Sequence, residues 1–293
     1  SFPGVIFRAS GDDGNYENFY LRPHQSANPD SNQYTPVINN ILEWQLYPEF
    51  QSQMRYRFGE WFHVRLEIAE HSARIFVDSN EPRVIAYLKL APRAGAVALS
   101  GSNQGAYFAN INVTPGPQAE APPEQPPANL PAGLVHAWSV TAAMSEANAL
   151  AAAEANHLNT LSWTTLPVET NGVANLSRIA TRTDETPMTL ARFTVRSDRA
   201  RSAPLHFGFS DKVHVYLNGA LLFAGDDTQG SRDYRFLGEV GFWYMLQLPL
   251  RRGENEIVFA VSDGAGGRNV GGGGWGALAA FTDMTGLAIT NAH

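Results

Sequence analysis

Five side chains in the first part of the sequence have the chemistry of a sugar-binding site: Arg22, His24, Gln33, Tyr34 and Trp44. Aromatic rings stack on the C–H faces of pyranose rings, while amide and guanidinium groups reach the hydroxyls. Arg22 and His24 are two positions apart, which places them on one face if both belong to a strand. The sequence therefore predicts a ligand surface centred on these residues.

The same stretch has a catalytic interpretation. A polysaccharide lyase needs a proton-transferring group and a neutralising group, for which Tyr34 and His24 are the candidates. A glycoside hydrolase needs two carboxylates on one face, but Glu67 and Glu70 would face opposite sides of a strand. The alternative is that these residues form neither a binding site nor a catalytic site, because Pro23 ends the strand and His24 is an ordinary loop residue.

Asp226, Asp227 and Asp263 are the candidate metal ligands. Ca²⁺ takes roughly six to eight oxygen ligands, so these carboxylates could join backbone carbonyls around a structural Ca²⁺. The alternative is that they are solvated carboxylates in turns. The Gly-rich stretch that begins at Asp263 lacks the Gly-Lys-Ser/Thr of a phosphate loop, and we expect an ordinary loop there.

Composition excludes several classes of protein. The formal net charge of −7 over 293 residues, without a block of Lys and Arg, argues against nucleic-acid binding. The absence of cysteine excludes disulfides and cysteine-ligated zinc. No apolar run approaches the length of about 18 residues that a membrane span needs.

Low charge and many aromatic residues favour an exported bacterial protein, located in the periplasm, on the cell surface or outside the cell. The abrupt start at Ser1 suggests a processed or trimmed amino terminus.

Three tryptophans, Trp61, Trp163 and Trp243, are expected in the hydrophobic core.

Short alternating segments fill both halves of the chain and predict an all-β fold of two antiparallel β-sandwich or jelly-roll domains. Residues 1–114 form the first domain, residues 115–131 a Pro-rich linker, and residues 132–293 the second. One helix is expected over 145–157, capped by Ser145. The predicted strands of the first domain are 4–10, 16–22, 60–70, 73–79, 83–90, 95–101 and 106–113. Those of the second domain are 189–195, 203–209, 212–225, 243–250, 255–263 and 275–281.

Asn218-Gly219 lies between two alternating segments and predicts a tight hairpin, because both residues tolerate the positive φ of a type I′ turn.

Two family resemblances follow from longer stretches of sequence. "GVIFRAS", "NYENFYLRPH", "QYTPV", "EWQLY", "GEWFHVRLEI" and "ARIFVDS" together resemble the concanavalin A-like, laminin G-type sandwich of bacterial secreted proteins. "FSDKVHVYLNGALLFAGDD", "LRRGENEIVFAVSDGAGG" and "GGWGALAAF" resemble the galactose-binding-like jelly rolls attached to carbohydrate-active enzymes. The second resemblance implies that Gly253 and Asn255 are structural.

The first resemblance also implies that further strands precede Ser1. We then expect an open sheet edge, covered by an upstream segment, by the second domain or by a partner protein.

Together these features predict an exported protein that binds glycans or assists their processing, with a polysaccharide or other glycan as its partner. One alternative is a glycan-degrading enzyme, hydrolase or lyase, built on the first sandwich. The other is a structural protein of the cell surface.

Overall fold

The computed structural model describes residues 2–11, 14–101, 105–155, 158–228, 231, 239–263 and 273–290. The chain divides into two compact units, Ser1–Glu124 (unit 1) and Gln125–His293 (unit 2). Each is built from antiparallel sheets, which confirms the predicted all-β class. Within the described ranges, no helix is long and apolar enough to cross a membrane.

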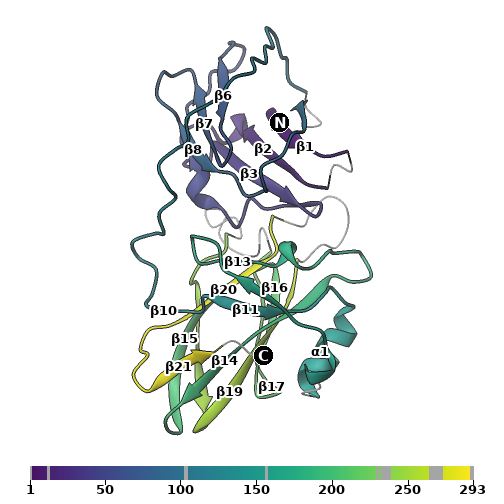
Figure 1. Ribbon diagram of the computed structural model, residues 1–293, viewed down its shortest axis with the longest axis vertical. Coiled ribbons are helices and arrows are strands. Elements are labelled where there is room, and N and C mark those ends of the chain that lie inside the picture. The colour runs from purple at the N-terminus through teal and green to yellow at the C-terminus, as the bar shows by residue number, and fades with distance from the viewer. Residues whose placement is uncertain are drawn as a thin grey trace. The chain divides into compact units, whose positions relative to one another are not determined.

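Unit 1 contains a six-stranded sheet of order β4-β3-β2-β1-β9, in which β5 also pairs with β3, and a three-stranded sheet of order β6-β7-β8 (Figure 1). The strands of the larger sheet are β1 (Gly4–Ala9), β2 (Tyr16–Leu21), β3 (Asn32–Ile38), β4 (Ile41–Leu42), β5 (Gln51–Ser52) and β9 (Ala96–Ser100). Those of the smaller sheet are β6 (Val64–Ile68), β7 (Ser72–Val77) and β8 (Val84–Tyr87).

Aromatic residues join the two sheets of unit 1. Phe50 ends the short 3₁₀ helix η2 (Pro48–Phe50), and its ring lies 5.3 Å from the Tyr34 ring of β3. On the other side, the Phe50 ring lies 6.2 Å from the Tyr87 ring of β8. Because Phe50 and Tyr34 are both buried, the core of unit 1 runs between its two sheets at this point.

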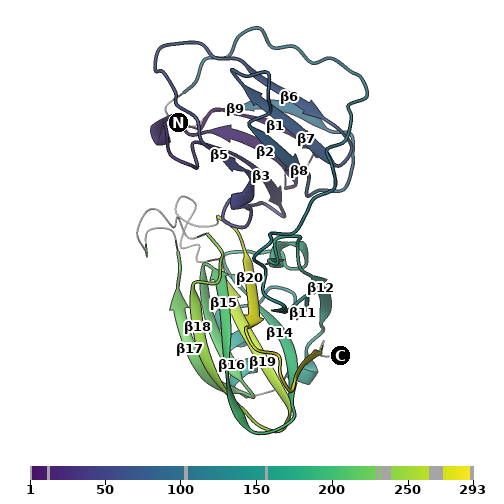
Figure 2. The ribbon, with the colours of Figure 1, turned by 90° about the vertical axis from the view of Figure 1, so that its left-hand side faces the viewer.

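Unit 2 is a sandwich of a five-stranded and a seven-stranded sheet (Figure 2). The first has the order β10-β20-β15-β18, with β13 on β20, and the second β12-β11-β14-β19-β16-β17, with β21 on β14. The strands of the first sheet are β10 (Gly133–Leu134), β13 (Ala174–Asn175), β15 (Arg201–Ser210), β18 (Tyr244–Leu250) and β20 (Gly276–Phe281). Those of the second are β11 (Ala137–Val140), β12 (Thr164–Pro167), β14 (Met188–Ser197), β16 (Lys212–Leu217), β17 (Ala220–Asp226), β19 (Gly253–Ser262) and β21 (Leu287–Thr290).

The predicted helix is α1 (Glu146–Glu154). Ser145 caps it as expected, since the Ser145 hydroxyl accepts a hydrogen bond from the Asn148 amide at 3.4 Å. Buried Ala149 and Ala153 set the helix against the seven-stranded sheet. The last two predicted helical residues, 156 and 157, lie outside the described residues.

The Pro-rich segment predicted as a linker makes specific contacts at its amino-terminal half. The division between the units falls inside it, after Glu124. The Ser72 hydroxyl donates to the Glu120 carboxylate at 2.5 Å, and the His71 amide donates to the other oxygen at 2.8 Å. Lys89 pairs with Glu124 at 2.9 Å. Residues up to Glu124 therefore belong to unit 1 by packing.

Two strand assignments from sequence are wrong. Residues 106–113 alternate as a strand would, yet they form no described ladder, and Tyr107, Ile111 and Val113 are exposed. Conversely, β3 was not predicted, although it is the central strand between β2 and β4.

Strand β9 lies at the edge of the larger sheet and pairs, within the described part of the chain, with β1. Val97 and Leu99 of this strand are exposed. The expectation that such an edge is covered stays a prediction.

The predicted hairpin forms between β16 and β17. Asn218 and Gly219 have φ values of 51° and 83°, as a type I′ turn requires. The Asn218 carboxamide also accepts from the Glu256 amide at 3.0 Å and donates to Asn255 Oδ1 at 3.2 Å. The turn is thereby tied to β19.

Replacing Gly219 by Val forces a β-branched residue into positive φ. We expect Gly219→Val to lower the free energy of unfolding of unit 2 by about 1 kcal/mol or more. Ala220→Val, one position later on the exposed part of β17, is the matched control and should be nearly neutral. Urea unfolding of both variants measures the difference, and equal midpoints would contradict the expectation.

Candidate functional site

Three of the predicted site residues come together on one face of the β2–β3 ladder. The Arg22 guanidinium donates to the Asp30 carboxylate at 2.6 Å and to Gln33 Oε1 at 3.2 Å. Its Cζ lies 5.4 Å from the centre of the Trp44 ring, and Gln33 Nε2 donates to the Trp44 carbonyl at 2.8 Å. Arg22, Gln33 and Trp44 thus form one network, with Tyr20 alongside.

This network is buried. Arg22 is 6% exposed and Gln33 is 0% exposed, while Trp44 is half-buried. The terminal nitrogens of Arg22 bond to Asp30, Tyr20 and Gln33, and Gln33 Nε2 donates to the backbone carbonyls of Trp44 and Tyr47. Their contacts are therefore those of a structural network, in which Trp44 is the member that stays partly exposed.

His24 lies on a short 3₁₀ helix, η1 (Pro23–Gln25), and not on a strand. Because β2 ends at Leu21, the assumption that Arg22 and His24 share a strand face is wrong, and the alternative that Pro23 ends the strand is confirmed. His24 is exposed, and its ring lies 5.0 Å from the Phe2 ring.

Tyr34 points to the opposite face of the sheet. It pairs in register with Phe19, whereas Gln33 pairs with Tyr20. The Tyr34 hydroxyl donates to Glu17 Oε2 at 2.6 Å and accepts from the Lys89 amide at 3.1 Å. Burial and the neighbouring Glu17 carboxylate raise the pKa of Tyr34 well above its ordinary value. Such a phenol holds its proton, which is the opposite of what a general base requires.

The candidate calcium ligands have partners within the protein. Asp226 is exposed and lies 3.6 Å from Lys212, and its Oδ1 accepts from the Thr228 amide at 2.9 Å. Buried Asp263 pairs with Arg182 at 2.7 Å. The amide of buried Asp227 donates to the Asp211 carbonyl at 2.7 Å. Among the residues that the structure describes, no three His, Asp or Glu side chains are grouped to hold a metal ion. Residues 264–272 of the Gly-rich stretch lie outside the described residues.

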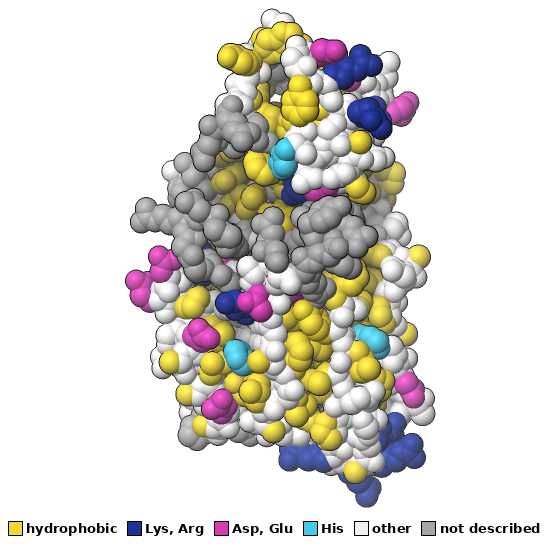
Figure 3. All heavy atoms as spheres, turned by 180° about the vertical axis from the view of Figure 1, so that it is seen from behind, with side chains coloured by type: hydrophobic (Ala, Val, Ile, Leu, Met, Phe, Trp, Pro, Cys, Tyr) yellow, Lys and Arg dark blue, Asp and Glu magenta, His cyan; other side chains and the backbone are white. Residues whose placement is uncertain are grey.

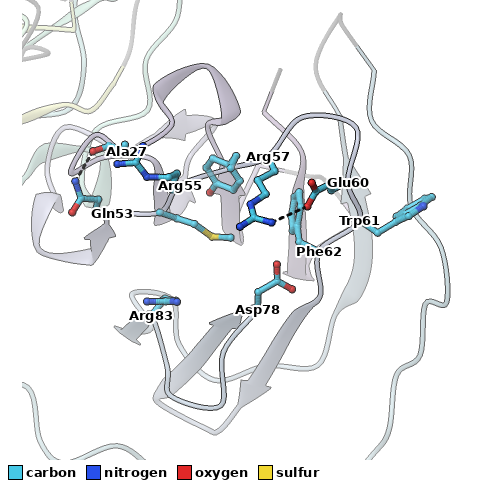
Figure 4. Close-up of a pocket in the computed structure, with 11 residues that line it drawn as sticks. Ala27, Gln53, Arg55, Arg57, Glu60, Trp61, Phe62, Asp78 and Arg83 are labelled. Carbon is cyan, nitrogen blue, oxygen red and sulfur yellow. Dashed lines mark hydrogen bonds and ion pairs between the residues drawn. The ribbon is translucent and has the colours of Figure 1, made fainter.

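A pocket of about 470 Å³ lies elsewhere on unit 1 (Figure 4). It is formed by the segment between β5 and β6, the turn between β7 and β8, and the loop that follows η1. Its lining residues combine aromatic rings, guanidinium groups and carboxylates: Ala27, Gln53, Met54, Arg55, Tyr56, Arg57, Glu60, Trp61, Phe62, Asp78 and Arg83.

The wall of this pocket is held by hydrogen bonds. The buried Tyr56 hydroxyl donates to the Ser31 carbonyl at 2.9 Å, and the Tyr56 ring lies 5.7 Å from the Phe62 ring. Asp78 Oδ1 accepts from the His63 amide at 2.7 Å. These contacts fix two aromatic rings and one carboxylate in place.

The rim of the pocket is exposed and charged. Trp61 is 70% exposed, and Figure 4 shows its ring at one end of the pocket, directed outward. Arg57 lies 3.6 Å from Glu60 and, in Figure 4, points toward the middle of the pocket. The expectation that Trp61 and Trp243 belong to the core is wrong, since Trp243 is also exposed; Trp163 is half-buried.

The pocket was missed because Glu60-Trp61 was assigned to a strand that starts only at Val64. The signal was present in "MRYRFGEWF", residues 54–62, where aromatic and charged residues alternate around Gly59. Gly59 has φ of 81°, so the chain turns there and leaves Trp61 outside the sheet.

Comparison with known proteins adds little. No family model matches the chain, and no curated protein matches it. A solved structure described as that of a family 35 carbohydrate binding module from an environmental isolate is similar over 38% of this chain and 77% of its own, at 12% identity and a TM-score of 0.28. A likeness at this score carries no argument about function. The concanavalin A-like and galactose-binding-like resemblances stay predictions, within a confirmed β-sandwich class.

The raised pKa of Tyr34 makes unit 1 sensitive to alkaline pH. Above the ordinary tyrosine pKa of 10.0, the unfolded state releases this proton while the folded state retains it. The free energy of unfolding should therefore fall as pH rises from about 9 to about 11, and Tyr34→Phe should flatten that slope. Urea unfolding across this pH range measures the effect.

Tyr107→Phe is the matched control, since Tyr107 is 93% exposed, and it should keep the wild-type slope. Tyr20, whose pKa is also raised by burial, leaves a residual slope in Tyr34→Phe. Identical slopes in wild type and Tyr34→Phe would contradict the assignment.

Proposed function

We infer that this protein binds carbohydrate, and that the pocket bordered by Trp61 and Arg57 is its binding site. The observation that supports this most directly is the exposed Trp61 ring beside a pocket that combines guanidinium, carboxylate and amide groups. An indole at the rim of a polar pocket is suited to stack on the C–H face of a sugar ring.

The size and chemistry of the pocket agree with a short stretch of glycan. A volume of about 470 Å³ falls within the range typical of small-molecule sites. Arg57, Arg83 and Asp78 offer planar donors and acceptors for neighbouring hydroxyls. One sugar unit would lie among these groups, and the next would stack on Trp61 at the rim.

The pocket is also preformed. Its Tyr56 wall is bonded to Ser26 and Ser31, and the Ala27 amide donates to the Met54 carbonyl at 2.8 Å. A preformed site loses little conformational entropy on binding, which matters for sugars because each hydroxyl contact contributes little net free energy.

We extend the proposal to an exported protein with a binding or accessory role in glycan processing. Low charge and the absence of cysteine are compatible with that location. The surface around Trp44, predicted from sequence, is the second candidate site, because Trp44 is partly exposed and its ring lies 5.4 Å from the Arg22 guanidinium carbon.

Replacement of Trp61 tests the site. After a glycan array identifies ligands for the full chain, we expect Trp61→Ala to weaken binding by roughly 1–3 kcal/mol, or about 5- to 150-fold, through loss of the stacking ring. Calorimetric titration measures the affinity, and the thermal midpoint should change little because Trp61 is exposed.

Trp44→Ala and Trp243→Ala are the matched controls. If only Trp44→Ala loses glycan affinity, the binding site is the surface predicted from sequence. If only Trp243→Ala loses it, the binding site is on unit 2. No ligand on the array would remove the proposed function. A reducing-end assay on the bound glycans separates binding from hydrolysis, and absorbance of unsaturated products separates it from lyase action.

A further inference from the structure

We propose, resting on the glycan-binding function above, that the ligand is an acidic glycan whose uronic acid carboxylate is held between Arg57 and Arg83. The pocket is lined by three arginines and two acidic residues, an excess of one positive charge. The whole chain carries a formal net charge of −7, so this local excess opposes the overall balance.

The acidic residues of the pocket have partners within it. Glu60 lies 3.6 Å from Arg57, in a pair that is exposed on both sides. Asp78 Oδ1 accepts from the His63 amide at 2.7 Å. The Asp78 carboxylate is thus fixed by a backbone contact, and neither carboxylate lies within ion-pair distance of Arg83 or Arg55 in the described structure.

All three guanidinium groups keep donors for a ligand, since the one ion pair of Arg57 is its exposed contact with Glu60. Arg83 donates its backbone amide to the Ile75 carbonyl and its Nε to the Val77 carbonyl at 3.5 Å, and its two terminal nitrogens make no hydrogen bond with the described residues. Arg55 is exposed and makes no hydrogen bond or ion pair with the described residues. In Figure 4, Arg57 and Arg83 approach the pocket from opposite sides.

This arrangement fits a carboxylate on a sugar ring. A guanidinium presents planar donors that match the two carboxylate oxygens, and Arg remains charged at every physiological pH. An excess of one positive charge balances one carboxylate, whereas a phosphate dianion would leave net negative charge beside Asp78. The neighbouring sugar unit can then reach the outward Trp61 ring.

Matched pairs of ligands test this charge preference. Oligomers of galacturonate, of mannuronate and guluronate, and of glucuronate-substituted xylan are titrated into the full-length chain beside their carboxyl-reduced forms, which keep the ring and lose the charge. We expect at least one acidic oligomer to bind tenfold or more tightly than its reduced form, and the difference to shrink between about 50 mM and about 300 mM salt.

Arg83→Gln should abolish the preference for the acidic form, so that the acidic oligomer and its reduced form bind this variant with equal affinity. Arg55→Gln should reduce the preference in part. Arg199→Gln is the matched control, because Arg199 is exposed in the turn between β14 and β15 of unit 2 and does not line the pocket. Lys and Arg side chains also gather at the lower end of the face drawn in Figure 3. Circular dichroism and thermal midpoints confirm that each variant is folded.

Equal affinity for acidic and reduced forms would overturn the proposed charge preference and leave glycan binding intact. Tighter binding of sulfated than of carboxylated oligomers would assign the arginines to a sulfate ester instead. Failure of every oligomer and of every array glycan to bind would overturn the charge preference and the proposed function together.

Discussion

The buried ion pair between Arg22 and Asp30 is the interaction on which the pocket side of unit 1 depends. The guanidinium and carboxylate lie 2.6 Å apart, with side chains only 7% and 11% exposed. Burying two charges costs several kcal/mol per ion unless their remaining donors and acceptors are occupied. Here Tyr20 and Gln33 accept hydrogen bonds from Arg22 Nη2, while the buried Nε has no hydrogen-bond partner among the described residues. The pair therefore closes the loop between β2 and β3 into one defined conformation.

The loop between β2 and β3 connects the ion pair to the pocket through hydrogen bonds. Ser31, next to Asp30, accepts the Tyr56 hydroxyl at its carbonyl, and the Ser31 hydroxyl accepts the Met54 amide at 2.5 Å. Ser26 accepts the Tyr56 amide at 2.9 Å. A chain of hydrogen bonds thus runs from the β2–β3 ladder to the pocket wall. Loss of the ion pair would release that wall even though Arg22 and Asp30 line no part of it.

The fold class, the α1 cap and the type I′ hairpin could be predicted because each is a local pattern: alternation, Ser145 before a helix, and Asn218-Gly219. Strand β3 could not, since every residue from Asn32 to Ile38 is buried on both faces and Pro36 lies within it, so no alternation is visible. Residues 106–113 show the converse error. Their alternation is clear, but a strand needs a neighbour to pair with, and that information is not local.

The candidate site shows the same limit in chemical terms. The sequence selected residue types suited to sugars, and the structure brings Arg22, Gln33 and Trp44 into contact. The sequence does not show which of these side chains are buried. Buried polar groups form their hydrogen bonds within the protein, so they are not left for a ligand. The exposed groups with capacity left over, Trp61 and Arg83, come from segments far apart in sequence. Arg22 acts on the pocket only through Asp30 and the neighbouring Ser31, which bonds to Tyr56 and Met54, and the groups proposed to meet the ligand lie on other segments.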